Sequence, residues 1–320
     1  MDKIGFIKYL ESKNLAQTSI NAYVKFVESF FVKMKKEDIQ ITKPDVLKFL
    51  EYLKNNRKTQ NSYRKNYLIA LNHYFTYLYE NEKISQNPCL LLKIRGVKRK
   101  TLCKIYTPEE LDQLFDNYYI SFIRNFDDSH YRNKQQKQEA RLSRERNVLM
   151  LSILIYQGVR ASDILKIRTG DIDLIKATLR IQGGKRRNGR TLPLKASQIG
   201  LFMHYLQNIR PQLLNYQIDD TDILFLSLFS HFGKKKADSD KFSINIFSNF
   251  FRKQLKTIDK QFISLQQIRT SVIANWLKTN GLRKTQYLAG HRYVSTTESY
   301  LPNNIDNLID DINKLHPLDF

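Results

Sequence analysis

Apolar residues recur at intervals of three and four through the first 87 positions of the chain, and this period predicts amphipathic helices. Four such groups, separated by polar stretches, begin near Ile4, Ile20, Val46 and Leu68. Thr18 and Ser19 are expected to cap the second helix, and Pro44 stands in the first turn of the third, where its missing N–H costs little. The pattern therefore predicts a small helical bundle over residues 1–88.

The helical pattern stops at Pro88, and in the segment that follows, residues 89–105, the stretch 93–100 is basic and has no clear apolar face. We interpret this segment as a linker between two domains. A second domain is predicted over residues 106–320, because Thr107 and Pro108 supply the N-cap and the first position of a new helix.

Residues 178–182 and 190–194 alternate apolar and polar side chains around a glycine-rich stretch, which indicates a β-hairpin. The stretch 125–155 starts polar and becomes apolar, which predicts a solvated helix start that continues into a buried helix. Helical spacing also appears over 242–258 and 305–315. Together these elements predict a mainly α fold with one small antiparallel β-sheet, in the α+β class.

The charge of the chain indicates what kind of partner the protein binds. The chain has 320 residues, of which 53 are Lys or Arg and 31 are Asp or Glu, and its net charge of +22 is far more than solubility requires. A nucleic acid is the simplest partner, because each neutralised phosphate releases counterions and so adds affinity. About half of the basic excess lies in the first hundred residues, so the charge is spread along the chain.

Cys89 and Cys103 are the only cysteines, and neither has the spacing of a zinc site. We therefore expect reduced thiols and no metal. The first residues lack the apolar core of a signal peptide, and no apolar run approaches the roughly 18 residues of a membrane span. A cytoplasmic protein with access to DNA and no membrane partner is the expectation.

Five short motifs place reactive side chains in the second half of the chain. They are Gly158-Val159-Arg160, Gly184-Lys185, Gln266-Gln267-Ile268-Arg269, Ala289-Gly290-His291 and Thr296-Thr297-Glu298-Ser299-Tyr300. A tyrosine hydroxyl, with a pKa of about 10, needs cationic neighbours if it is to ionise as it attacks. Guanidinium groups donate paired hydrogen bonds to phosphate oxygens. This inventory suits the attack of a tyrosine on a phosphodiester.

The motifs also carry a family resemblance. Residues 158–167 resemble the first conserved box of the tyrosine recombinases, the phage integrase family, and residues 265–300 resemble their second box. The resemblance implies an N-terminal SAM-like core-binding bundle followed by a catalytic domain. It also implies a tetramer that acts on double-stranded DNA with short inverted-repeat core sites and needs neither metal nor ATP nor another cofactor.

By this resemblance, Arg160 and Arg269 bind the scissile phosphate and His291 donates a hydrogen bond to it. Tyr300 is the nucleophile that forms a 3′-phosphotyrosyl bond. Lys185 matches the lysine that protonates the departing 5′ oxygen. The alternative for Lys185, a hairpin lysine that touches only the DNA backbone, stays open.

One position departs from the family pattern, because Gln266 stands where a histidine is usual. An amide can hydrogen bond to the phosphate but cannot take up the tyrosine proton, which would pass to water, to phosphate or to solvent positioned by Gln267. Asp163 matches a family Glu or Asp, and we interpret it as a carboxylate that orients an arginine. An ordinary acid on a helix surface is its alternative.

Basic side chains of the linker and the hairpin are candidate DNA contacts. They are Lys93, Arg95, Lys98, Arg99, Lys100, Arg186, Arg187 and Arg190. Near the C-terminus, the apolar residues Ile305, Leu308, Ile309, Ile312 and Leu315 fall on one face of a short helix over about 305–315. The resemblance suggests that this exchange helix docks on a neighbouring protomer in a ring of four, and packing on its own domain is the alternative.

Site-specific recombination or integration, for a mobile genetic element in a bacterial nucleoid, is the leading hypothesis. A type IB topoisomerase or a telomere resolvase would use related chemistry and stays an alternative. The third reading is a catalytically impaired DNA-binding relative, in which Gln266 is an early sign of decay. The five other catalytic positions, all retained, argue against that reading.

Overall fold

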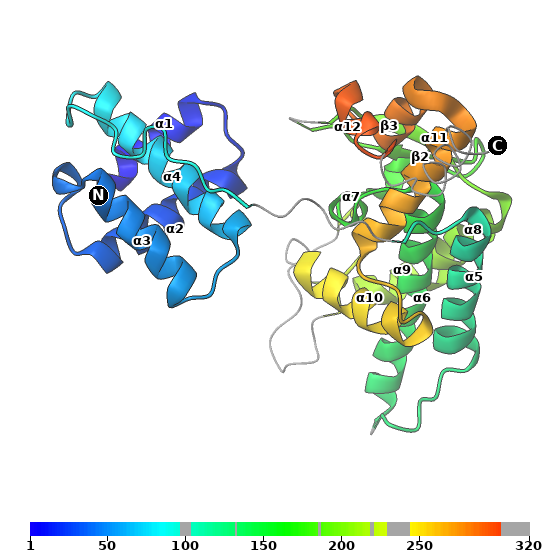
Figure 1. The fold of residues 1–320 in the computed structure, drawn as a ribbon. Coiled ribbons are helices and arrows are strands. Elements are labelled where there is room, and N and C mark those ends of the chain that lie inside the picture. The colour runs from blue at the N-terminus through cyan, green and yellow to red at the C-terminus, as the bar shows by residue number, and fades with distance from the viewer. Residues whose placement is uncertain (97–103, 132, 185–186, 218–220, 229–243, 302–320) are drawn as a thin grey trace, which may run out of the picture. The chain divides into compact units, whose positions relative to one another are not determined.

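The computed structural model describes residues 1–96, 104–131, 133–184, 187–217, 221–228 and 244–301. The chain divides into two compact units, Met1–Thr101 and Leu102–Phe320 (Figure 1). The described residues are mostly helical, with one small sheet in the second unit, which confirms the predicted fold class. Within them, no helix combines the length and apolar character needed to cross a membrane.

The first unit contains the four predicted helices. They are α1 (Lys3–Ser12), α2 (Gln17–Met34), α3 (Lys43–Asn55) and α4 (Asn61–Glu80), with a 3-10 turn, η1, at Asp38–Gln40. Aromatic rings fill the core between them, and the edge of Phe30 meets Phe49 at a centroid distance of 5.0 Å. Edge-to-face packing of this kind adds to the stabilisation that burial alone supplies. The unit therefore has a hydrophobic core of its own.

The predicted helix start is right for α3 and wrong for α2. In α3, Thr42 and Asp45 form a reciprocal capping box and Pro44 lies in the first turn, as expected. The predicted caps of α2 are wrong, because the helix already begins at Gln17 and the backbone N–H of Ser19 donates to the carbonyl of Ala16. Residue 19 is thus inside the first turn, where its hydroxyl cannot serve as an N-cap.

The beginning of the predicted linker packs against this first core. Cys89 is 3% exposed, and burial raises the pKa of its thiol to about 12. Further along, the side-chain amide of Asn61 donates to the carbonyls of Arg95 and Gly96. Residues 89–96 are therefore attached to the helical bundle, and Lys93 and Arg95 lie exposed on it.

The second unit is built from helices around the small sheet. Its helices and helical turns are α5 (Pro108–Tyr119), η2 (Ile120–Arg124), α6 (Lys134–Gln157), α7 (Ala161–Ile164), η3 (Thr169–Asp171), α8 (Ala196–His204), η4 (Tyr205–Ile209), α9 (Arg210–Leu214), α10 (Ile244–Ile258), α11 (Leu265–Ala289) and α12 (Val294–Glu298). Every residue of α6 from Arg146 to Ile155 is buried, because α5, α8 and α11 pack around it. This confirms the predicted change from a polar start to a buried helix.

The sheet has three antiparallel strands in the order β1 (Ile172–Asp173), β2 (Thr178–Ile181) and β3 (Arg190–Pro193). Leu179 pairs with Leu192, so β2 and β3 form the predicted hairpin. β1 was not predicted, because two residues are too few to show alternation.

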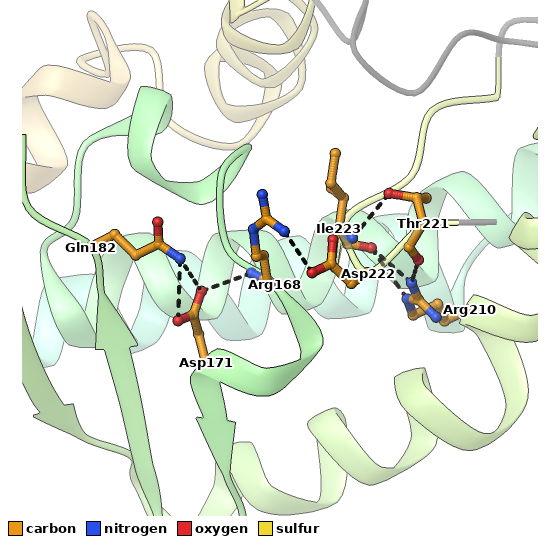
Figure 2. Close-up of polar contacts among 7 residues, drawn as sticks. All are labelled: Arg168, Asp171, Gln182, Arg210, Thr221, Asp222 and Ile223. Atoms are coloured by element: carbon orange, nitrogen blue, oxygen red, sulfur yellow. Dashed lines mark hydrogen bonds and ion pairs between the residues drawn. The ribbon is translucent and has the colours of Figure 1, made fainter. Parts of the chain in front are cut away.

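A network of polar contacts connects the segment before β1 with the residue that follows β2 and with residues 221–223 (Figure 2). Asp171 accepts hydrogen bonds from the backbone N–H of Arg168 at 3.0 Å and from the amide of Gln182 at 3.3 Å. The guanidinium of Arg168 also pairs with Asp222 at 2.7 Å. The contact with Gln182 joins the segment after α7 to the end of β2, where the hairpin loop begins, and the pair with Asp222 joins the same segment to residues 221–223.

Candidate active site

Arg269 is the most deeply buried member of the predicted site, at 1% exposed on α11. Its Nη1 atom donates to the carbonyl of Gly158 at 2.6 Å and its Nη2 atom to that of Ala289 at 2.8 Å. The guanidinium thus joins the end of α6 to the end of α11. Burial, and then the neighbouring charge of Arg160, lower its pKa to about 9, so it stays protonated at neutral pH.

His291 lies against this guanidinium and is 3% exposed. Its Nε2 atom is 3.2 Å from Nη2 of Arg269, and because a guanidinium only donates, Nε2 must accept. The proton is therefore on Nδ1, which lies 2.9 Å from the hydroxyl of Thr297. Burial first, and then Arg269, Arg160 and Arg190, lower the pKa of His291 to about 4. The imidazole is therefore neutral at physiological pH.

Tyr300 completes this group just after α12. Its ring stacks on that of His291, with a centroid distance of 5.6 Å and an interplanar angle of 19°. Ile273 and Ala289 pack on it, so the side chain is only 8% exposed. A contact with Tyr300 also favours the charged form of Arg269. The predicted nucleophile, one of the two arginines predicted to bind phosphate and the histidine are thus brought together.

Arg160 enters the same cluster as the N-cap residue of α7. It follows Gly158, whose φ of 53° ends α6 and where a Cβ would lie 2.7 Å from Cγ1 of Val272 on α11. A glycine there allows the two helices to approach closely. Nη1 of Arg160 is buried without a hydrogen-bond partner in the described structure. The charge of Arg160 lowers the pKa of both Arg269 and His291, so it lies near both groups.

Asp163 is buried, and the arginine that it pairs with is Arg187 of the hairpin loop. The sequence predicted an oriented arginine but not which one, and it predicted Arg187 only as a DNA contact. The backbone of Arg187 forms a β-bridge with His291, and the N–H of Asn188 donates to the carbonyl of Gly290 at 3.3 Å. The hairpin loop is therefore attached both to α7 and to the turn that carries His291.

Several predicted residues lie outside the described part of the chain. They are Lys98, Arg99, Lys100, Lys185, Arg186 and the helix predicted over 305–315. Gly184 and Arg187, which flank residues 185 and 186 in the sequence, exchange backbone hydrogen bonds of 2.9 and 3.1 Å.

Gln266 is exposed in the first turn of α11, three residues before Arg269, and no described residue hydrogen bonds to its amide. Residues three apart share a helix face. Gln267 differs: it is 2% exposed, its amide oxygen accepts from the N–H of Ile263, and its amide nitrogen donates to the carbonyl of Lys104. The alternative in which Gln267 positions solvent therefore loses its basis.

Sequence reasoning missed two features of the site. Thr297 was part of a quoted motif but had no role, and it accepts the Nδ1 proton of His291. Arg190 was predicted as a DNA contact of the hairpin, and its burial beside Gly290, at the candidate site, was not foreseen. Strand alternation could have indicated this, because Arg190 faces the same side as the buried Leu192. Among the described residues, no three His, Cys, Asp or Glu side chains gather as a metal site would require.

Such a cluster, carried on a helical domain with a small antiparallel sheet, suits phosphoryl transfer through a tyrosine. The sequence model of the Phage integrase family matches residues 132–306, and that of the Phage integrase, N-terminal SAM-like domain matches residues 5–84. The chain therefore belongs to the phage integrase family, and it is a DNA strand transferase of the tyrosine recombinase class.

Individual relatives agree with this assignment. The tyrosine recombinase XerC of Anoxybacillus flavithermus is 25% identical over 95% of this chain and 93% of its own. The fold is similar to that of the XerH site-specific recombinase bound to its palindromic difH substrate, with a TM-score of 0.65, 21% identity and coverage of 95% and 81% of the two chains. A lambda integrase tetramer bound to a Holliday junction gives a TM-score of 0.59 at 14% identity, over 92% of this chain and 74% of that one.

Proposed function

We propose that the protein is a site-specific DNA recombinase that cuts and rejoins duplex DNA with Tyr300 as the nucleophile. The observation that carries this proposal is the assembly of Tyr300, His291 and Arg269 in one buried cluster. The tyrosine oxygen forms a bond to the scissile phosphorus while the bond to the 5′ oxygen breaks. The phosphodiester energy is kept in the 3′-phosphotyrosyl link, and attack by a 5′ hydroxyl reverses the step.

The arginines stabilise the charge that builds on the phosphate during this attack. Arg160 and Arg269 are assigned to the non-bridging oxygens, and Arg160 has a buried donor still available. Lys185 is assigned to the proton that the 5′ oxygen gains. His291 accepts from Arg269 in the free protein, so donation from Nε2 to the phosphate requires that this contact be exchanged and the proton moved. Gln266 leaves the tyrosine proton to water or phosphate.

The biological setting is a finer proposal. We infer a tetramer on two duplex core sites with short inverted repeats, serving a mobile genetic element in a bacterial nucleoid. The net charge of +22 supports a DNA partner, and the similar fold of the lambda integrase that forms a tetramer on a Holliday junction supports the proposed assembly.

The test begins with the core site, which is selected from a random duplex library with the wild-type protein. A duplex nicked near the cleavage position then traps the covalent product, because the short strand with its 5′ hydroxyl diffuses away. We expect an adduct that survives denaturation with wild-type protein and no adduct with Tyr300→Phe. Tyr293→Phe is the control, because Tyr293 is 62% exposed in the same region.

An adduct that persists in Tyr300→Phe, or none with the wild-type protein, would contradict the proposal. Relaxation of a plasmid without the selected site would indicate a topoisomerase instead, and hairpin ends on a palindromic target would indicate a telomere resolvase. Tight binding without cleavage would indicate an impaired relative.

A further inference from the structure

Arg190 is a buried charge without a partner in the described structure. It lies at the start of β3 and is 4% exposed. Its Nε, Nη1 and Nη2 atoms are all buried and none of them has a hydrogen-bond partner. A guanidinium presents five N–H donors, and burying them unsatisfied costs folding free energy. Buried donors that lower stability in the free protein point to a ligand that accepts hydrogen bonds from them.

The charges around Arg190 offer no compensation. Its pKa is lowered to about 10, first by burial and then by the cations Arg160 and Arg187, and among its neighbours only Tyr287 acts in the opposite direction. Oδ1 of Asp163 is paired with Arg187, and the charges that act on Arg190 do not include Asp163. Arg190 therefore remains protonated at neutral pH in surroundings that are positive overall, which is the environment that an anion prefers.

Arg190 also lies at the catalytic cluster. A Cβ on Gly290 would collide with its Nη1 atom, so the glycine beside His291 allows the guanidinium to approach. The charge of Arg190 lowers the pKa of both Arg269 and His291. Nη1 of Arg160 and Nε of Arg269 are likewise buried and unpaired. Unused donors of three arginines thus gather at one place.

We propose that Arg190 is a third phosphate-binding arginine of the active site, donating to a non-bridging oxygen of the DNA phosphodiester held by Arg160 and Arg269. The proposal rests on the proposed function for the identity of that phosphodiester. The guanidinium fork fits phosphate oxygens, and a lysine in its place would supply charge without the paired geometry.

The first test separates a ligand-binding role from a packing role. Arg190→Met keeps the length of the side chain and removes the buried charge. We expect its melting temperature in phosphate-free buffer to equal or exceed that of the wild-type protein, because an unsatisfied charge is lost. Arg180→Met is the matched control, since Arg180 lies on the adjacent strand, pairs with Thr191 across the sheet and is exposed.

The second test uses inorganic phosphate as the probe and needs no DNA. A ligand that binds only the folded protein raises the melting temperature by mass action. We expect phosphate to raise it for the wild-type protein and for Arg180→Met, relative to chloride at equal ionic strength. For Arg190→Met the rise should be at most half as large. An equal rise in all three proteins, or a lower melting temperature for Arg190→Met in phosphate-free buffer, would overturn the proposal.

The third test uses the nicked core-site duplex. Arg190→Met should form the covalent adduct about 10²-fold more slowly than wild-type protein, with Arg190→Lys between them. A neutral methylphosphonate at the scissile position should shrink the difference between Arg190→Met and wild type, because the charge that Arg190 meets is gone. A wild-type rate in Arg190→Met would sink this inference alone. Failure of the wild-type protein to form any adduct would contradict the proposed function. The melting temperatures in phosphate would still show whether Arg190 binds a phosphate group.

Discussion

Gln266 lies exposed in the first turn of α11, one helical turn before Arg269, and no described residue hydrogen bonds to its side-chain amide. It is therefore on the same face of the helix as the buried guanidinium but nearer to solvent. Because Gln266 is exposed, we expect the position to accommodate a histidine side chain, which is of similar size. The absence of a base at this position is thus a chemical difference and not a structural one.

Gln266→His should accelerate cleavage, because an imidazole can accept the tyrosine proton that an amide cannot. We expect a gain of about 10²-fold, at the lower end of what a general base supplies. The gain should appear above about pH 6.5, where an unperturbed imidazole is neutral, and disappear below it. Single-turnover adduct formation between pH 5.5 and 8.5 measures it.

Gln261→His is the control for this substitution, because Gln261 is also exposed and precedes the same helix. Equal rates in wild type and Gln266→His across the pH range would show that proton removal does not limit this enzyme.

Residue identities at the site were predictable from the sequence because the motifs are linear, and Arg160, Arg269, His291 and Tyr300 are brought together in the structure. Their partners were not predictable. That Asp163 holds Arg187 depends on how the hairpin loop packs, which spacing along the chain does not encode.

At the scale of elements, α11 is a broken helix. Gly281 has φ 69° and ψ 178°, which interrupts the helical backbone within Leu265–Ala289. The part of α11 after Gly281 places Ala289 beside Arg269, and the Nη2 atom of Arg269 donates to the carbonyl of Ala289. The sequence predicted the four N-terminal helices and the hairpin from their periodicity. It did not reveal this break, because a single glycine in a helical stretch is compatible with a continuous helix.

Two glycine substitutions should have opposite effects. The backbone of Gly281 is in a region that essentially only glycine adopts, so Gly281→Ala should lower the free energy of unfolding by about 1–3 kcal/mol and slow adduct formation. Gly200 lies inside α8 with open space around it, so Gly200→Ala should raise the free energy of unfolding by about 0.5–1 kcal/mol. Urea denaturation measures both, and effects of the same sign would contradict the account of the break.

The whole molecule consists of two units with separate cores, and its basic charge extends through both. The proposed cleavage chemistry belongs to the second unit, whereas the proposed recombination on two duplexes requires several protomers to assemble. The predicted exchange helix lies outside the described residues, so its role stays a prediction that assembly can test.

Ile309→Asp places a charge on the apolar face predicted for that helix, and Asn307→Asp places the same charge on its polar face. We expect Ile309→Asp to bind one core-site duplex and to cleave the nicked duplex as wild type does, but to lose the complex of four protomers with two duplexes. Light scattering of the DNA complexes measures this. A lower melting temperature of Ile309→Asp without DNA would instead indicate packing on its own domain.

The β-bridge between Arg187 and His291 joins two segments with different tasks. One belongs to the loop in whose sequence Lys185 lies, and the other to the turn whose histidine contacts Arg269. A displacement of that loop would break the bridge and the bond from Asn188 to Gly290, and so would disturb the histidine as well. We therefore expect a shift of Arg187 and Asn188 and a loss of the contact between His291 and Arg269 to occur together and not independently.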